Sequence, residues 1–207
     1  MSIKKRKQLG EYSFTIKFSI RVGAISFAIA LISVSLFYWV TQKFDKEFLQ
    51  FTVAVVGVAA AVTSAFYVGS AIQENSKARK EDRAISLIST WNDSYYSGLR
   101  RTALRKIRDL IKTLPLDEQP HAVHEVLKTD NSLEEDIVTI LNFLEEVAAC
   151  VNNDLVDIGL IDDYFGYIIP RVAFVFKSWI TGRQDGRNNS LYSALETLGK
   201  EWKDNLK

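Results

Sequence analysis

A pair of histidines is the first feature of this chain that could bind a metal ion or move a proton. His121 and His124 are its only histidines, and Glu125 follows directly. Helical zinc motifs have the orders H-E-x-x-H or H-x-x-E-H, and this sequence has neither. We therefore interpret the histidines as surface residues of a short helix, and we predict neither a metal site nor a cofactor.

Two adjacent carboxylates, Glu145 and Glu146, could suggest acid–base catalysis. Neighbouring residues of a helix point about 100° apart, so these side chains cannot face each other as an acid–base pair. We expect Glu145, at the border of the apolar face, to form a salt bridge with an arginine of a basic helix. Cys150 is the only cysteine, which excludes an intramolecular disulfide, and we expect it to be a buried apolar residue.

The sequence also lacks a G-x-S-x-G turn, a P-loop and a dinucleotide-binding glycine pattern. We therefore predict no catalytic residues, no enzymatic activity and no small-molecule substrate.

Four basic residues form the sharpest charge pattern, which we call the basic stripe: Arg101, Arg105, Arg108 and Lys112. Their spacing places all four on one face of a helix. Such a stripe could contact the phosphates of a nucleic acid or of lipid headgroups. It could instead be an ordinary solvated face that pairs with residues 115–169, where thirteen Asp and Glu stand against one Lys. The sequence leaves both readings open.

Two long uncharged segments, Val22–Gln42 and Phe48–Gln73, precede these residues and are separated only by Lys43–Glu47. Each exceeds the roughly 20 residues that cross a bilayer core. They predict a transmembrane helical hairpin at residues 22–73. Neither segment contains a charged residue, which argues against a transporter, because ion and proton paths use intramembrane charges.

The placement of Lys and Arg predicts the orientation of this hairpin. Basic residues are concentrated before the first span and directly after the second, whereas the short loop holds two lysines and two acids. By the positive-inside rule, both termini lie in the cytoplasm.

A second stripe in the predicted second span, the small-residue stripe, consists of Gly57, Ala61, Ala65 and Gly69. Small residues on one face let helix backbones approach closely in lipid. The stripe could mediate self-association into a homo-oligomer. It could instead, or also, pack against small residues of the first span, namely Ala24, Ser26, Ala28 and Ala30.

The remainder of the chain has helical periodicity throughout, so we predict an all-α fold. The whole chain then consists of a basic cytoplasmic segment (residues 1–21), the hairpin (22–73), a helical stalk (74–97) and a cytoplasmic helical bundle (98–207). We expect a helix break at Gly98 and a central core helix that begins at a capping box of Ser132 and Glu135. We also expect a break or kink at Pro170, a loop at 182–189 and a final amphipathic helix at 190–206.

Three short segments of the predicted stalk and bundle resemble a known family: Trp91–Tyr96, Leu141–Ala148 (L-N-F-L-E-E-V-A) and Asp163–Gly166. They are similar to a bacterial family of unknown function with an L-N-F-x-E-E core helix and, often, a two-transmembrane anchor. This layout resembles the two-transmembrane effectors of retron anti-phage loci. The resemblance supplies no catalytic residues. It implies a protein of the bacterial inner membrane that is held inactive by a reverse transcriptase with its DNA–RNA hybrid.

Two functions follow as expectations. In the first, the protein is a toxic effector of antiviral defence that perturbs the inner membrane when it is released, and so stops phage spread by abortive infection. In the second, the hairpin only tethers a cytoplasmic binding or adaptor module that has no toxic activity.

Overall fold

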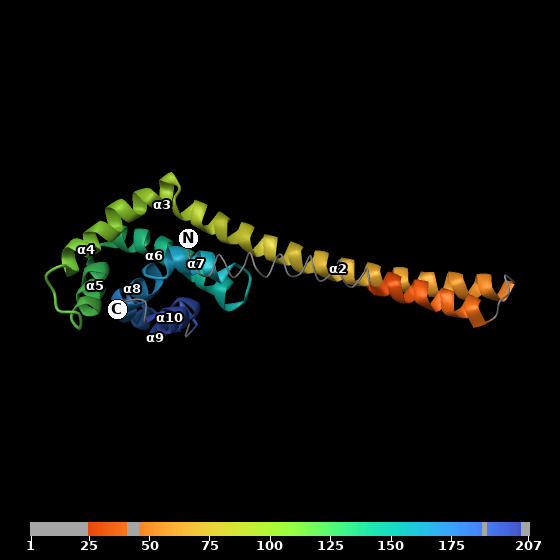
Figure 1. The fold of residues 1–207 in the computed structure, drawn as a ribbon. Helices are drawn as coiled ribbons and strands as arrows, with labels where there is room; N and C mark the ends of the chain where they lie inside the picture. Colours follow the sequence, from red (N-terminus) through yellow and green to blue (C-terminus); the bar gives the residue numbers. More distant parts are fainter. Residues whose placement is uncertain (1–24, 41–45, 188–189, 204–207) are drawn as a thin grey trace. The chain divides into compact units, whose positions relative to one another are not determined.

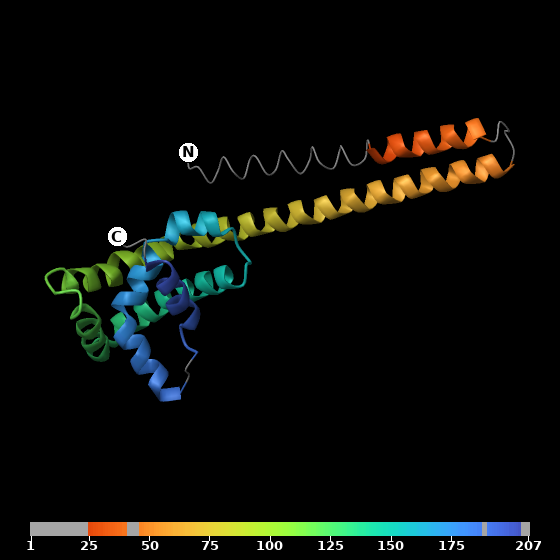
Figure 2. The same cartoon turned by 60° about the horizontal axis from the view of Figure 1, so that its bottom comes forward.

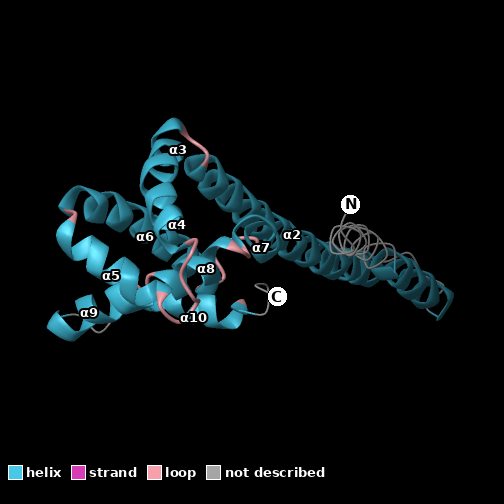
Figure 3. Ribbon diagram, turned by 90° about the vertical axis from the view of Figure 1, so that its left-hand side faces the viewer, coloured by secondary structure: helices cyan, strands magenta, loops and turns pink. Residues whose placement is uncertain are grey.

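The computed structural model describes residues 25–40, 46–187 and 190–203, and within these ranges every regular element is helical (Figure 3). The prediction of an all-α fold is confirmed. The chain divides into two compact units, Met1–Ala78 and Arg79–Lys207.

In the first unit, the helix Ile25–Val40 runs beside the first part of α2 (Lys46–Trp91), as Figures 1 and 2 show. Among the described helices only α2 is long and apolar enough to cross a membrane. Ile25–Val40 is apolar but shorter than a span. The rest of the predicted first span and the basic segment at residues 1–21 lie outside the described residues.

Aromatic and small side chains join these two helices. The ring of Phe37 stacks on Phe51 with centroids 4.3 Å apart, and it lies 6.1 Å from the ring of Phe48. Ala30 is 5% exposed and also lies in the contact. Most other large apolar side chains of this pair are exposed, including Trp39, Val53 and Val58.

The second unit is a bundle of short helices around one apolar core. Its elements after α2 are α3 (Ser94–Leu99), the π-helical turn η1 (Arg100–Leu104), α4 (Arg105–Ile111), α5 (Gln119–Thr129), α6 (Asn131–Asn152), α7 (Ile158–Phe165), α8 (Ile168–Val175), α9 (Lys177–Arg187) and α10 (Ser193–Glu201). α6 is the central helix that the sequence predicted, with a continuous buried face that includes Cys150. α10 packs on both α6 and α8.

The sequence predicted the first helix break of this unit at Gly98. The break lies instead at Asn92 and Asp93. α2 ends at Trp91, and the Asp93 side chain accepts a hydrogen bond from the Tyr96 N–H (2.8 Å), which caps α3. An aspartate is among the strongest N-caps, whereas a glycine inside a helix costs only about 1 kcal/mol. The helix therefore passes through Gly98 and η1 into α4.

Further predictions of helix ends were wrong for similar reasons. The cap of α6 is Asp130, which accepts from the Leu133 N–H (3.0 Å), rather than the predicted box of Ser132 and Glu135. Pro170 does not end a helix but lies in the first turn of α8, where a missing N–H does no harm.

The predicted loop at 182–189 was also wrong in its first part, because α9 continues to Arg187. Gly182 lies against the His124 ring, and a Cβ at this position would be 3.0 Å from its Cε1. This tertiary contact favours glycine inside the helix. The final helix is shorter than predicted, since Tyr192 has a left-handed backbone (φ 59°) and α10 begins only after it.

Candidate functional site

The basic stripe lies along one wall of a groove in the second unit, with a volume of about 820 Å³. The opposite wall comes from α8 and the residue before it, with Tyr167 and Arg171. We call this feature the basic groove. Its lining comprises Arg100, Arg101, Leu104, Arg105, Ile107, Arg108, Asp109, Ile111, Lys112, Gln119, Tyr167, Arg171, Val172 and Val175.

The fold fixes which side of α4 faces the groove. Ala103, Ile107 and Ile111 are buried and anchor η1 and α4 in the core. Because the basic stripe has a different register on the same helix, its four side chains are exposed. The structure thus brings the four predicted residues together on one wall.

The charges of the stripe are not neutralised by the acidic segment. Acids of that segment pair with other cations, as in Lys106–Asp130 (3.7 Å) and Arg183–Glu134 (2.6 Å). Arg108 has a weak contact with its neighbour Asp109 at 3.8 Å. Within the described ranges, the other three cations of the stripe form no ion pair.

A buried hydrogen-bond network supports the far end of the groove. The Gln119 side chain is 6% exposed and donates to the carbonyls of Ile111 (3.3 Å), the last residue of α4, and of Leu114 (3.1 Å), just after it. Its oxygen accepts from the Arg171 guanidinium at 2.8 Å, a charge-assisted bond. Arg171 is therefore positioned on the opposite wall by a group that also holds α4.

The π-helical turn shapes the near end of the groove. The Thr102 hydroxyl donates to the carbonyls of Gly98 (3.1 Å) and Leu99 (3.2 Å). The Arg100 guanidinium lies 4.5 Å from the centroid of the Trp91 ring, which fixes its position by a cation–π contact. π-helical turns are rare and are often found at functional sites.

The residues that the sequence reasoning missed are Arg100, Gln119, Tyr167 and Arg171. Arg100 directly precedes the stripe in sequence, but its spacing is off the helical repeat. The other three come from α5 or from the start and first turns of α8, and no local pattern connects them to α4. Only the fold places them in one groove.

The predicted salt bridge of Glu145 was wrong. Its carboxylate accepts hydrogen bonds from the backbone N–H groups of Ala194 (3.1 Å) and Leu195 (2.7 Å), the first turn of α10. A helix N-terminus carries free N–H donors and a partial positive charge, so it competes well with an arginine for a carboxylate. Glu146 is exposed.

The segments that carry the family resemblance converge in space. The ring of Trp91 stacks on Phe143 (5.4 Å) and meets Phe165 edge-on (5.7 Å). The Tyr164 hydroxyl donates to the Asn92 side chain at 2.5 Å. Most positions of the L-N-F-x-E-E pattern are thus structural, as core residues, an aromatic stack and a helix cap, whereas its last residue, Glu146, is exposed.

Asn142 of the same motif accepts a hydrogen bond from the Tyr192 hydroxyl at 3.0 Å. Burial raises the pKa of Tyr192, and the nearby Glu145 raises it further against the opposing effect of Arg183. A phenol is protonated at neutral pH even at its ordinary pKa of 10.0, so Tyr192 is a donor there.

The two histidines do not assemble a site with other ligands. His121 is exposed, while the Nδ1 atom of His124 is buried and without a hydrogen-bond partner. In the part of the chain that the structure describes, no group of three His, Cys, Asp or Glu side chains is suited to hold a metal ion.

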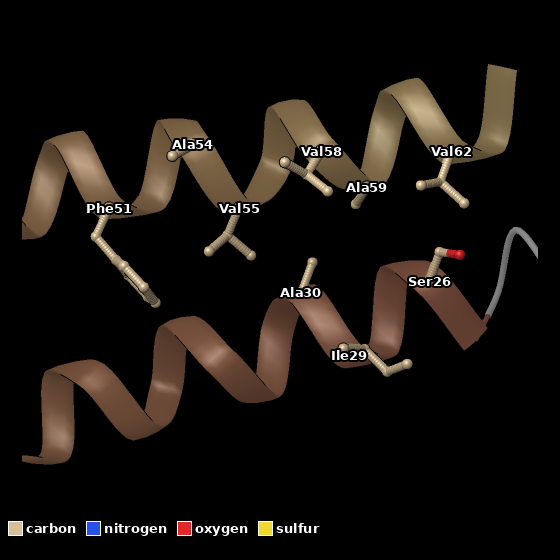
Figure 4. A pocket seen from close by; sticks show the side chains of 9 residues that line it. All are labelled: Ser26, Ile29, Ala30, Phe51, Ala54, Val55, Val58, Ala59 and Val62. Carbon is tan, nitrogen blue, oxygen red and sulfur yellow. The ribbon is translucent and has the colours of Figure 1, made fainter. Parts of the chain in front are cut away.

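The small-residue stripe lies on an exposed face of α2. A Cβ built on Gly57 or on Gly69 meets no atom within 4 Å. The helix Ile25–Val40 packs instead near Phe51, Val55 and Ala59, which border an apolar pocket of about 380 Å³ between the two helices (Figure 4).

At 100° per residue, Gly57 and Ala61 lie roughly opposite this contact face. Ala30 and Ser26 are two of the small residues that were expected to meet the stripe. They border the pocket with Phe51, Val55 and Ala59 and therefore face the side of α2 away from Gly57 and Ala61. Ala28 is exposed, and Ala24 lies outside the described residues.

Comparison with known protein families identifies a domain in this chain. A domain of unknown function (DUF4760) is found at residues 51–202. No curated protein and no solved structure matches the chain.

Proposed function

We propose that this chain, which belongs to the DUF4760 family of domains of unknown function, is a self-associating membrane effector of bacterial defence. In this proposal both uncharged segments span the inner membrane and both termini lie in the cytoplasm. The hairpins assemble through the small-residue stripe and perturb the membrane when the protein is released. A retron-like partner, a reverse transcriptase with its DNA–RNA hybrid, would hold it inactive.

Exposed apolar surface supports the membrane location. The most apolar window of α2 is 0% buried. Side chains such as Trp39 (74% exposed) and Val53 (68%) would face water without a bilayer. Contiguous apolar surface of this extent is rare on soluble monomers and marks contact with lipid or a partner.

The observation that carries the proposal is the position of the small-residue stripe. The helix Ile25–Val40 occupies another face of α2, so the exposed face at Gly57 and Ala61 remains for a second copy of α2. In lipid, a face of Gly and Ala allows close backbone packing, which drives helix association. Self-association is the first step that a membrane-perturbing assembly needs.

The test compares two adjacent alanines. Ala61→Ile places a bulky side chain on the stripe. Ala60→Ile adds the same bulk about 100° away on α2, at a second apolar pocket of about 490 Å³ between the two helices, which has room for it. We expect the unaltered protein to depolarise the membrane and stop growth when expressed alone, Ala61→Ile to lose both its oligomer and this effect, and Ala60→Ile to retain them. Undisturbed membrane potential and growth at high expression, with and without phage infection, would contradict the effector function.

The basic groove favours a second candidate function, a membrane-tethered binding module. Replacing residues 22–73 by an unrelated two-span anchor separates the two. Retained function would support the tether, and lost function would support the effector.

A further inference from the structure

We infer that the basic groove binds a single strand of nucleic acid through its phosphates, with Tyr167 as a stacking surface for a base. The inference concerns the second unit alone. Binding at this groove can therefore be tested whether or not the hairpin perturbs a membrane.

The charge pattern fits a linear polyanion. From Arg101 to Lys112 the basic stripe extends about 16 Å at 1.5 Å per residue. Arg171 adds a guanidinium from the opposite wall. Since Arg101, Arg105 and Lys112 form no ion pair within the described ranges, binding of phosphates would not require existing salt bridges to break.

Between the cations the walls of the groove are apolar, which suits nucleotide bases better than charged phosphates. Leu104, Val172 and Val175 line the groove, which gives it an apolar surface. Tyr167 lies at the same groove and is 63% exposed, so the face of its ring is accessible to a base. Cationic grooves with exposed aromatic rings are the common means by which proteins hold single strands without sequence preference.

The concave shape argues for a single strand over a duplex. A helix that reads duplex DNA must project into the major groove. The charged face of α4 instead borders a groove whose other wall is α8. The volume of about 820 Å³ resembles that of small-molecule sites, about 300–1,000 Å³, so a short segment of one strand fits.

The experiment uses the full chain in nanodiscs of neutral phosphatidylcholine and measures fluorescence anisotropy with short mixed-sequence oligonucleotides. Single-stranded DNA, single-stranded RNA and the matching duplex are titrated separately over a range of salt concentrations. We expect one or both single strands to bind more tightly than the duplex, with the comparison of DNA and RNA identifying the source. Affinity should fall steeply with salt, by a slope of about 0.7 per phosphate contact.

Three variants test the named residues. Arg105→Gln with Arg108→Gln should reduce the salt slope by about 1.4. The matched control, Lys106→Gln with Lys128→Gln, removes two exposed charges outside the groove and should leave binding unchanged. Tyr167→Ala should weaken single-strand binding about tenfold without altering the slope. Circular dichroism confirms that each variant is folded.

Several results would overturn the inference. These are an absence of binding at low salt, equal losses in the groove variant and its control, or duplex binding as tight as single-strand binding with no effect of Tyr167→Ala. Preferential binding of an acidic peptide or of anionic vesicles, with oligonucleotides unable to compete, would assign the groove to another partner.

Discussion

Replacement of Glu145 by alanine should destabilise the second unit, because this side chain caps a helix that is distant in sequence. Its two oxygens accept from the N–H groups of Ala194 and Leu195 at 3.1 and 2.7 Å. The residue at the N-cap position itself, Tyr192, makes no capping hydrogen bond with its side chain. Glu145 therefore does for α10 what an N-cap residue does for most helices.

The magnitude follows from three contributions. Loss of a helix cap costs about 0.5–2 kcal/mol. Loss of a carboxylate at the positive end of the helix dipole adds about 0.3–1 kcal/mol. Leu195 is fully buried, so its N–H is poorly placed to bond water instead. We expect the free energy of unfolding to fall by about 1.5–3 kcal/mol.

The assay is urea unfolding of the full chain in detergent, followed by tryptophan fluorescence. Trp179 is a suitable reporter because its ring lies 6.1 Å from that of Tyr192, beside the start of α10. Glu146→Ala is the matched control: it removes the same group one position along, from an exposed site, and should change stability by less than about 0.5 kcal/mol.

Equal and small effects of Glu145→Ala and Glu146→Ala would refute the capping role. A double-mutant cycle tests the rival explanation, the salt bridge first expected from the sequence. Coupling between Glu145→Ala and Arg105→Gln well above 0.5 kcal/mol would reinstate that bridge.

Four further outcomes are expected. Gly199→Ala should destabilise by about 1–3 kcal/mol in urea unfolding, because its Cβ would lie 2.6 Å from that of Ala173, whereas Gly98→Ala, with open space around it, should stabilise by about 0.5–1 kcal/mol. Burial opposes ionisation of Glu134, but hydrogen bonds from Arg183 and Trp179 outweigh it and lower its pKa. The stability that this carboxylate adds is therefore present at neutral pH and lost as the pH falls below its ordinary value of 4.5, so melting temperatures of the unaltered chain and Glu134→Gln should converge in acid. Trp91→Ala should cost about 3–5 kcal/mol, measured by the same urea titration, because its buried ring stacks on Phe143.

Local patterns in the sequence predicted the helices better than they predicted where helices end. The periodic apolar residues of α6 are its buried face, and the basic stripe is on one exposed face as expected. The helix ends depended on which of several nearby residues formed the cap and on contacts with other helices, and residue spacing alone reveals neither. Asp130 lies two residues before Ser132 and took the capping role, and Gly182 stayed helical because it contacts His124.

The sequence predicted one wall of the candidate site but not the other. The four cations of the stripe share one helix, so their spacing reveals them. Tyr167 and Arg171 belong to the other wall, and Gln119 reaches Arg171 across 52 positions of chain. Such partners are set by tertiary packing, and a single sequence contains no local signal for them.

The long separation between Glu145 and the helix that it caps has a consequence for biosynthesis. The two partners are 50 residues apart, and α10 also covers apolar surface on α6 and α8. At about 5–20 residues per second, a ribosome needs roughly 3–10 s to make the intervening chain. During that interval the nascent bundle displays an uncovered apolar face. This face makes it a substrate for chaperones until α10 docks.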